Sequence, residues 1–341
     1  MTKPNQKKPQ LEDIAAALGI SKSTVSRAIS GKGRIRAETR EKVFACIKEM
    51  NYRPNMIAKS LSEQRTYNIG VVIPMDQSEF DAPFFQTCLT GIAKECALHD
   101  YDAVVIGTER DNHTQLQRVI ENRKVDGVLV TRPASDGSIE ELLSENGMPY
   151  VVLGRSVHSD SVIVDSDHVK GCTELTSYLL MSTPPDKLGL LIGNMEYTVN
   201  RSRYTGFMSA FGSSHAEERL IFTGADSELK FTKAVSMLLR EKPSCIVCGD
   251  DMLCMKLLAT LNARGMRIPE DIRVASFYDS VYLDSYSPPI TSLIFDAAKL
   301  GSAAAAKLMN LLSGAPAGEH LPLMSFEMLI RRSTMNPGQN K

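Results

Sequence analysis

The chain has 341 residues, of which 43% are hydrophobic and 23% charged, as in a globular protein with several lobes or with one large and one small domain. Its net charge of −1 conceals an asymmetry, because residues 1–65 carry 14 Lys and Arg against six Asp and Glu, while the remainder is acidic. A basic segment attached to an acidic body indicates a polyanionic partner for the N-terminal part of the chain.

Several classes of protein are disfavoured. The first residues lack the apolar core of a secretory signal, and no apolar run reaches the ~18 residues of a membrane span. The seven Cys have no disulfide-framework spacing, and Cys245 and Cys248 lie in an apolar run without a second Cys/His pair to complete a zinc site. We therefore expect a cytoplasmic protein with buried thiols and no cofactor.

Residues 11–30 predict two short helices separated by a turn at Gly19. The first covers Leu11–Leu18, with apolar residues at helical spacing, and the second begins at Ser21, a favoured N-cap residue. Two short helices joined by a turn containing Gly are typical of a helix-turn-helix, although a surface helical hairpin remains an alternative because the motif is short.

The second helix carries donors near its start. These are Lys22, Ser23, Thr24, Ser26 and Arg27. Small hydroxyl groups together with Lys and Arg at a helix N-terminus suit phosphate and base-edge contacts in a DNA major groove.

A third helix is predicted over Ala37–Met50, after a basic loop at Ser30–Arg36 that suits a phosphate backbone. Its apolar face is expected to contain Val43, Phe44, Ile47 and Met50. Gln10 and Arg36 fall at N-cap positions where Ser or Thr is favoured, a deficit of ~1 kcal/mol each. Residues 56–62 predict a short helix that needs a partner to be stable, with a plain linker as the alternative.

From Asn68 onward, apolar strands alternate with amphipathic helices. Strands are predicted at 69–73, 103–106, 127–131, 150–153, 188–192, 245–248 and 274–277, and helices near 84–99, 113–123, 138–146, 168–182, 200–212, 227–240, 252–265 and 296–313. This alternation predicts parallel sheets in an α/β fold of two lobes, with ligands at the carboxyl ends of the strands.

Many motifs in a fixed order then identify a resemblance. The most specific are DIAAALGISKSTVSRAISGKGRI, TREKVFACIKEMNYRPNMIAKSL, VDSDHVKG, RSRYTGF, RGMRIPEDIRVASFYD and SPPITSL. From Leu11 to about Met335 the chain resembles the lactose/galactose repressor family of bacterial transcription regulators. The resemblance implies a small all-α helix-turn-helix headpiece at 1–52, a hinge helix or linker at 53–65, and at 66–341 a two-lobed α/β body like that of periplasmic binding proteins, with parallel sheets and Rossmann-like lobes.

The resemblance also implies roles in binding double-stranded DNA. Lys22 and Ser23 match base-reading positions, and Thr24, Ser26 and Arg27 match positions that contact phosphates or bases. In the hinge helix, Ala58 and Leu61 match residues that enter the minor groove, with Leu61 as a wedge that kinks the DNA. The remaining expected DNA-binding residues are Arg34, Asn55 and Lys59.

An effector site in the cleft between the lobes is implied in the same way. Arg203 matches the family's effector-binding arginine, and Asp250 matches a family acidic position. Further cleft residues are expected from strand-end position or match: Asp76, Phe84, Arg155, Asp167 and Phe295. For each acidic residue, a helix cap or a surface charge is an open alternative.

One position departs from the family pattern. The usual strand-end pair is two Asp, whereas this chain has Tyr278 followed by Asp279. Asp279 is kept among the expected effector ligands. For Tyr278 we hypothesise recognition through stacking or a phenol hydrogen bond, so that the effector is bound differently from the sugars of other members.

The expected function is a repressor of carbohydrate-utilisation genes that binds a palindromic operator as a homodimer and is switched by a small effector, a sugar or sugar derivative. The end of the chain lacks the leucine heptad that makes some family members tetramers. The alternatives are an activator, a solute-binding protein of transport, which needs export, and an α/β enzyme, for which we find no P-loop, G-x-S-x-G or metal-ligand motif.

Overall fold

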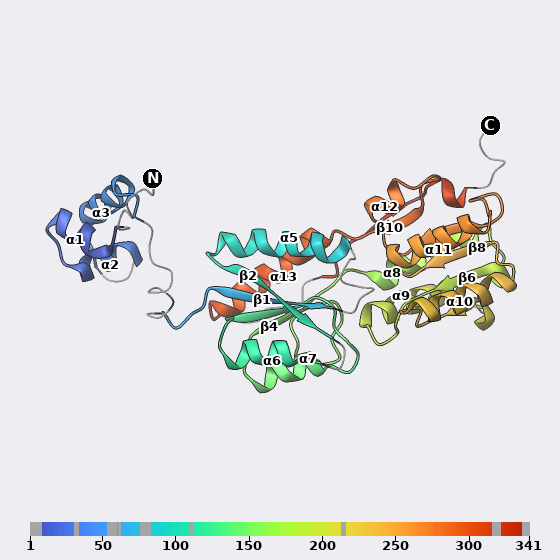
Figure 1. Cartoon of the computed structure of the whole chain (residues 1–341), viewed down its shortest axis with the longest axis horizontal. Coiled ribbons are helices and arrows are strands. Elements are labelled where there is room, and N and C mark those ends of the chain that lie inside the picture. The colour runs from blue at the N-terminus through green and yellow to red at the C-terminus, as the bar shows by residue number, and fades with distance from the viewer. Residues whose placement is uncertain are drawn as a thin grey trace, which may run out of the picture. The chain divides into compact units, whose positions relative to one another are not determined.

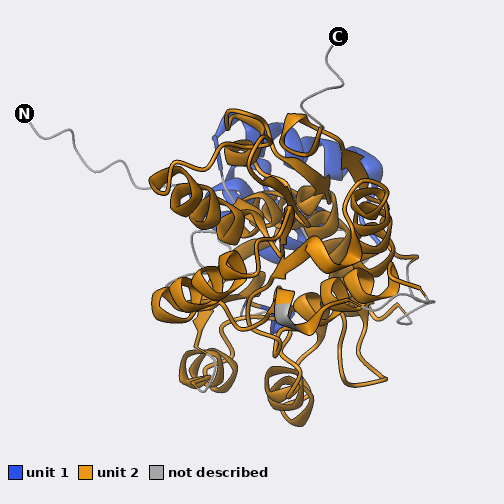
Figure 2. Ribbon diagram, turned by 90° about the vertical axis from the view of Figure 1, so that its right-hand side faces the viewer, with its two compact units in different colours: residues 1–65 blue, residues 66–341 orange. Residues whose placement is uncertain are grey.

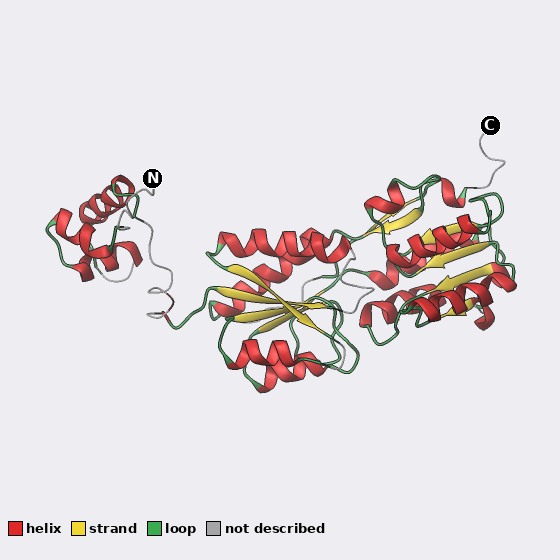
Figure 3. Cartoon of the chain, viewed as in Figure 1, coloured by secondary structure: helices red, strands yellow, loops and turns green. Residues whose placement is uncertain are grey.

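The computed structural model describes residues 9–30, 34–52, 60, 63–75, 83–109, 112–212, 216–315 and 322–335. The chain divides into two compact units, residues 1–65 and 66–341, which we describe separately (Figure 2). The first unit is helical, and the second contains all of the described strands (Figure 3). None of the described helices is long and apolar enough to cross a membrane.

The first unit contains α1 (Leu11–Leu18), α2 (Lys22–Ser30) and α3 (Ala37–Glu49). Gly19 ends α1 in the left-handed conformation, with φ of 63°, which permits the tight turn into α2. The hydroxyl of Ser21 accepts a hydrogen bond from the backbone N–H of Thr24 at 3.1 Å, so it acts as the predicted N-cap. The buried core consists of Ile14, Ala15, Val25, Ala28, Val43, Cys46 and Tyr52.

Two expectations for this unit need correction. Phe44 is 47% exposed rather than part of the apolar face of α3, because Val43 and Cys46 fill the core instead. The start of α1 is better supported than Gln10 alone suggests, since the carboxylate of Asp13 accepts a hydrogen bond from the Gln10 backbone N–H at 2.7 Å. The side chain of Arg36 makes no capping hydrogen bond at the start of α3, as expected.

The first lobe of the second unit is built on a five-stranded parallel sheet in the order β2-β1-β3-β4-β5. Its strands are β1 (Asn68–Pro74), β2 (Asp102–Thr108), β3 (Gly127–Val130), β4 (Tyr150–Leu153) and β5 (Ile163–Val164). Its helices are α5 (Pro83–Leu98), α6 (Thr114–Glu121), α7 (Ser138–Glu145) and α13 (Ala297–Leu312). One face of the sheet packs against α5 and α13, and the other against α6 and α7 (Figure 1).

The second lobe has a six-stranded sheet in the order β11-β10-β9-β8-β6-β7. Its strands are β6 (Leu188–Leu191), β7 (Ile221–Phe222), β8 (Cys245–Cys248), β9 (Arg273–Ser276), β10 (Thr291–Ile294) and β11 (Glu327–Leu329), and only β11 is antiparallel to its neighbour. Its helices are α8 (His168–Leu180), α9 (Thr198–Ser209), α10 (Glu228–Arg240), α11 (Asp251–Ala263) and α12 (Val281–Asp284). Short 3-10 helices lie at Pro185–Lys187, Glu218–Leu220 and Arg332–Thr334.

The chain passes between the lobes three times, after β5, after β10 and before β11. The first and third passages are hydrogen-bonded to each other, because Asp167 N–H donates to the Met324 carbonyl at 3.0 Å and Met324 N–H donates to the Asp165 carbonyl at 2.9 Å. Adjacent backbone connections of this kind form a natural hinge for relative movement of the lobes.

The seven strands predicted from sequence are present within two residues at each end, and the eight helices predicted for the body are likewise present. The short elements β5, β7, β10, β11 and α12 were not predicted. They contain two to four residues each and leave little periodic signal, whereas four-residue strands such as β4 and β8 were predicted from continuous apolar runs.

Candidate DNA-reading surface and effector pocket

The predicted reading residues lie on the outer side of α2. Lys22, Ser23, Ser26 and Arg27 are exposed, and Thr24 is half-buried. Arg34, which precedes α3, is also exposed. The apolar side of α2 packs on the core of the first unit, while its donors face solvent. Such a helix is able to enter a DNA groove without disturbing that core.

The donors at the start of α2 are held by local contacts. The ammonium of Lys22 forms an ion pair with the carboxylate of Glu12 in α1, which lowers the pKa of Glu12 below its ordinary value. The hydroxyls of Ser23 and Thr24 each lie 2.8 Å from the Ser21 hydroxyl. These contacts orient the first turn of α2, and Lys22 must leave Glu12 before it can reach a base.

The predicted hinge residues Asn55, Ala58, Lys59 and Leu61 lie outside the described residues. The same is true of Asp76 in the body. Their assigned roles stay predictions, as does the division of residues 1–65 into headpiece and hinge.

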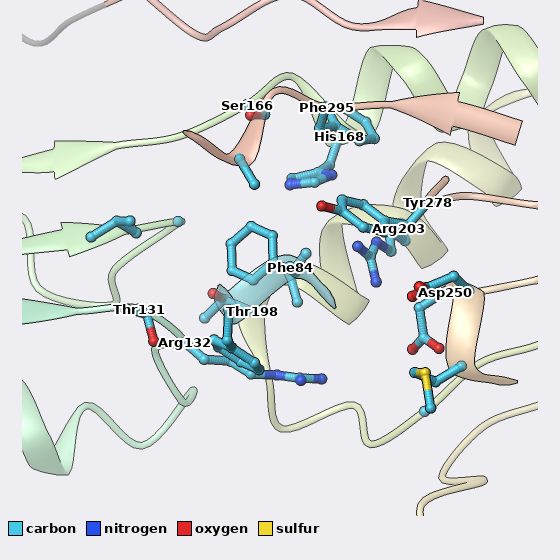
Figure 4. Close-up of a pocket in the computed structure, with 18 of the residues that line it drawn as sticks. Phe84, Thr131, Arg132, Ser166, His168, Thr198, Arg203, Asp250, Tyr278 and Phe295 are labelled. Atoms are coloured by element: carbon cyan, nitrogen blue, oxygen red, sulfur yellow. The ribbon is translucent and has the colours of Figure 1, made fainter. Parts of the chain in front are cut away.

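In the second unit, a cavity opens between the two lobes (Figure 4). Both lobes contribute side chains from the carboxyl ends of their strands and the starts of the following helices, as expected for an open α/β sheet. The polar lining residues are Thr131, Arg132, Asp165, Ser166, His168, Thr198, Arg203, Asp226, Asp250, Asp251, Lys256 and Tyr278.

Aromatic side chains form one wall of the cavity. The ring of Tyr278 lies parallel to that of Phe295, with centroids 6.4 Å apart, and meets the ring of Phe84 edge-on at 5.9 Å. The ring of His168 packs on Phe295 at 4.3 Å (Figure 4). Apolar ring faces next to polar groups suit a ligand that presents both C–H faces and hydroxyl groups.

Arg203 is a buried charge in this lining. Its side chain comes from α9, is 7% exposed, and its guanidinium lies 5.8 Å from the centroid of the Tyr278 ring. The buried Nε has no hydrogen-bond partner among the described residues. Burial lowers the pKa of Arg203, and the nearby Asp250 carboxylate opposes that change.

Most of the carboxylates in the lining are already engaged. Asp250 caps α11 by accepting from Leu253 N–H at 2.8 Å, and Asp226 forms an ion pair with Lys230 at 2.9 Å. Asp165 accepts from Ser166 N–H at 2.8 Å, and burial raises the pKa of Asp165 to about 6. Asp165 belongs to the first passage between the lobes, so ligand contacts there bear directly on the hinge.

A set of contacts joins the lobes beside the cavity. The backbone N–H of Ser135 donates to the Glu196 carbonyl at 2.7 Å, and the guanidinium of Arg201 donates to the Ser135 hydroxyl at 3.0 Å. The guanidinium of Arg132 stacks on the Tyr197 ring at 4.2 Å. These contacts connect the loop after β3 with the start of α9, so the lobes are in contact at both the hinge and the cavity.

The structure places five of the predicted effector residues in the cavity wall: Phe84, Arg203, Asp250, Tyr278 and Phe295. Three others do not line it. Asp167 caps α8 by accepting from Lys170 N–H at 3.1 Å, and Arg155 acts on the cavity only through Asp165, whose raised pKa it moderates. Asp279 is bound to Arg331, with Nη1 and Oδ1 2.7 Å apart. For these residues the expected contact with an effector is not supported.

Sequence reasoning missed several lining residues. Thr131 and Arg132 follow β3, and Ser166 and His168 follow β5. Since ligands bind at the carboxyl ends of parallel strands, the predicted end of β3 was sufficient to identify Thr131 and Arg132 as candidates. β5 itself contains only two residues and was not predicted, so the second pair gave no comparable signal. No group of three or more His, Cys, Asp or Glu in the described part of the chain is arranged to hold a metal ion.

A helix-turn-helix with an exposed, donor-rich second helix, together with a two-lobed α/β body around a polar and aromatic cavity, defines a ligand-responsive DNA-binding protein. The comparisons agree with this class. Residues 10–55 match the model for bacterial regulatory proteins of the lacI family, and residues 186–334 match a periplasmic binding protein-like domain. The chain thus combines a helix-turn-helix domain of the lacI family with a periplasmic binding protein-like domain, and its relatives are transcriptional regulators.

Relatives of known name match over nearly the whole chain. The HTH-type transcriptional regulator MalR of Staphylococcus xylosus is 29% identical over 95% of this chain and 97% of its own. A solved complex of the transcriptional regulator CelR with cellobiose is 26% identical, with a TM-score of 0.71 over 95% of this chain and 99% of the other. The lac repressor dimer bound to operator and an anti-inducer has the same fold, with a TM-score of 0.79, 22% identity, and coverage of 97% and 100%.

Proposed function

We propose that this protein is a homodimeric repressor of carbohydrate-utilisation genes, which binds a palindromic operator through α2 and is switched by a sugar or sugar derivative in the cavity between its lobes. The observation that carries this proposal is the cavity itself. It combines aromatic faces, a buried arginine and several carboxylates at the place where the two lobes meet.

The DNA-binding part of the proposal is supported by the exposed start of α2. Lys22 is long enough to reach guanine O6 and N7, while Ser23 and Ser26 offer short donors that suit closer contacts. Arg27 and Arg34 are exposed cations that suit phosphates, and each phosphate contact makes binding more dependent on salt. Because operator DNA is the partner, we place the protein in the cytoplasm.

The carbohydrate part is supported by the mixture of groups in the lining. Hydroxyl groups both donate and accept, so a sugar satisfies arginine and carboxylate side chains together. The pyranose ring also has apolar C–H faces that pack on aromatic rings such as Tyr278 and Phe84. The complex of the related CelR with cellobiose supports the same class of ligand for this chain.

The proposed switch is a change in the angle between the lobes. A ligand in the cavity contacts Asp165 and Ser166 on the hinge passages and lies beside the Ser135–Arg201 contact between the lobes. The bound ligand therefore favours one lobe angle over another. A change of lobe angle repositions the segments that lead to the headpieces of a dimer, and such coupling of ~1–3 kcal/mol alters DNA affinity roughly 5- to 150-fold.

We infer that the chain has no enzymatic activity. His168 and Ser166 both line the cavity, but no hydrogen bond joins the imidazole to the serine hydroxyl in the described part of the chain, so the pair lacks the contact through which a base activates a nucleophile. Burial lowers the pKa of His168 well below its ordinary value, which keeps it neutral. The alternative, a solute-binding protein with the same body, does not explain the exposed donors of α2.

Selection of bound DNA from a random library, with the full-length protein, tests the proposal. We expect a palindromic site whose half-site spacing reports a dimer, and loss or gain of binding when a particular sugar is added. A selected pool without any common sequence would refute specific DNA binding, and a palindrome unaffected by any sugar would refute the carbohydrate switch.

Variants of the same protein test the assignment of the reading helix. Lys22→Ala is expected to relax base preference at one position of the half-site. Arg34→Ala is the matched control, because loss of a phosphate contact weakens all sequences to a similar extent and reduces the salt dependence. An unchanged preferred site in Lys22→Ala would show that another side chain reads that base.

A further inference from the structure

The structure raises the question of which carboxylate completes the effector site. Tyr278 occupies the strand-end position where the family pattern has an Asp. The following Asp279 does not line the cavity and is bound to Arg331. The end of β9 therefore presents an aromatic ring to the cavity and no free acidic group.

Asp251, the first residue of α11, supplies such a group from a neighbouring element. It lines the cavity and is 2% exposed, yet its Oδ2 has no hydrogen-bond partner among the described residues. Burial and the adjacent Asp250 carboxylate raise the pKa of Asp251 to about 6, and the Ser280 hydroxyl beside the carboxylate opposes that change. A buried polar atom without a partner is costly to retain, and a ligand donor is a reason for retaining it.

Among the described residues, Arg203 offers an unpartnered donor in the same cavity, where Asp251 offers an unpartnered acceptor. Its Nε is also buried without a partner in the described part of the chain. The guanidinium of Arg203 moderates the raised pKa of Asp251, so the two opposite charges are close enough to interact, although no ion pair forms between them. The Arg203 guanidinium also lies 5.8 Å from the centroid of the Tyr278 ring, and Asp251 adds to the effect of burial in raising the pKa of Tyr278, so the three groups interact within one cavity.

The other acidic residues of the lining differ from Asp251. Asp250 is used to cap α11, and Asp226 is used in an ion pair with Lys230. Asp165 is held by the Ser166 backbone. Asp251 and Arg203 each have a buried side-chain atom without a partner among the described residues, as His168 does at Nδ1, and they are the oppositely charged members of this set.

We propose that Asp251 is a specificity-determining residue, and that it forms with Arg203 a pair that binds adjacent hydroxyl groups of an uncharged sugar ring while Tyr278 packs against the ring. One hydroxyl donates to Asp251 Oδ2, and the neighbouring hydroxyl accepts from the Arg203 guanidinium. This inference rests on the proposed carbohydrate function and deepens it.

The charges explain why the ligand is an uncharged polyol. An anionic group bound next to Arg203 would be repelled by the carboxylate of Asp251, and a cationic group bound next to Asp251 would be repelled by the guanidinium of Arg203. A vicinal diol satisfies both at once, because each hydroxyl is a donor as well as an acceptor. The hydrogen bond to a charged partner makes each hydroxyl individually important.

The experiment uses the full-length protein and isothermal titration calorimetry. A panel of neutral mono- and disaccharides, with sugar phosphates and uronic acids for comparison, first identifies a ligand. Monodeoxy analogues of that ligand are then titrated into the wild type and into Asp251→Asn, with Asp226→Asn as the matched control. Asparagine retains the shape of the side chain and removes the charge, and thermal denaturation of each variant verifies folding.

We expect one monodeoxy analogue to bind the wild type about 10- to 100-fold more weakly than the parent sugar, and this discrimination to fall to about three-fold or less in Asp251→Asn. Asp226→Asn should discriminate as the wild type does. If a neutral sugar binds and Asp251→Asn keeps the full discrimination pattern, the role of Asp251 is refuted while the carbohydrate function stands. Binding of charged sugars alone would also refute the Asp251–Arg203 pair, and binding of no sugar at all would refute the carbohydrate function.

Discussion

Arg331 and Asp279 are joined by two hydrogen bonds, 2.7 Å between Nη1 and Oδ1 and 3.0 Å between Nη2 and Oδ2. Both side chains are nearly buried, with 13% and 11% of their surface exposed. The same guanidinium also contacts the Ser292 hydroxyl and the Ile290 carbonyl. The acidic residue that follows Tyr278 thus fastens the C-terminal segment of the lobe to the residues after β9, and the same arginine contacts the start of β10.

Loss of this carboxylate is therefore expected to affect stability. Asp279→Asn leaves a nearly buried guanidinium with only the exposed Asp284 carboxylate as its counter-charge and should lower the free energy of unfolding by about 2–3 kcal/mol. Affinity for the effector should stay within about two-fold, because the side chain does not line the cavity. Urea denaturation and calorimetric titration measure the two quantities.

Asp284→Asn is the matched control for that variant. Asp284 lies 2.9 Å from the same guanidinium but is 67% exposed, so its loss should cost less than about 1 kcal/mol. A large loss of effector affinity in Asp279→Asn, with stability unchanged, would restore Asp279 to the effector site.

A second prediction concerns the contact of α5 with α13. A Cβ atom added at Gly91 would lie 1.9 Å from the backbone oxygen of Ala298, and one at Gly301 would lie 2.3 Å from that of Cys88. In most helices Gly→Ala is stabilising, because Ala has the higher helix propensity. Here Gly91→Ala should destabilise by about 3 kcal/mol, since the two backbones must separate.

Thermal denaturation measures this effect. Gly212→Ala is a useful comparison, because Gly212 has φ of 55° and open space where a Cβ would be, so only about 1 kcal/mol of backbone strain is expected. Stabilisation by Gly91→Ala would contradict the close approach of the helices.

The third prediction is a pH dependence at Asp251. Its raised pKa, about 6 in place of 3.8, means that between these values the folded protein binds this proton more tightly than the unfolded chain does. The contribution of Asp251 to the free energy of unfolding therefore falls as the pH rises through this window and stays low above it. At pH 7.5 the ionised group is a cost that Asp251→Asn removes.

We accordingly expect Asp251→Asn to be more stable than the wild type at pH 7.5, by about 1–3 kcal/mol, and the difference to disappear near pH 4. Melting temperatures of both proteins across this range provide the measurement. A difference of the same size at both ends would mean that the effect is independent of this proton.

The fourth prediction concerns the ion pair of Lys22 with Glu12. The ammonium must leave the carboxylate when it reaches a base, and the carboxylate also repels DNA phosphates. Glu12→Gln should therefore strengthen binding to all sequences by about two- to three-fold, without changing the preferred half-site. Fluorescence anisotropy with the selected operator and a scrambled duplex tests this, and a changed base preference would contradict it.

The headpiece shows how far local sequence determines structure. Gly19 and Ser21 specify the turn and the cap between α1 and α2 through their own backbone and side-chain chemistry, so both were predictable. Phe44 was not, because Val43, Phe44 and Ile47 satisfy a helical period equally well. The direction from which α1 and α2 pack on α3 decides which of them is buried.

The body follows the same division. The alternation of apolar strands and amphipathic helices predicted two α/β lobes with ligands at the strand ends, because burial on both faces of a parallel sheet leaves a periodic pattern in the chain. Arg203 and Tyr278 were correctly expected to face the cavity, since residues at strand ends and helix starts converge there.

Tertiary structure alone distinguished the acidic residues. By sequence, Asp167, Asp250, Asp251 and Asp279 are all carboxylates next to an element boundary. Whether such a group caps a helix, pairs with an arginine or keeps a free oxygen depends on partners as far as 52 residues away, such as Arg331 for Asp279. The sequence by itself determined the class of protein and the place of its site, because these depend on periodicity and local chemistry. Only the packing of distant segments decided that Asp251, and not Asp279, faces the cavity.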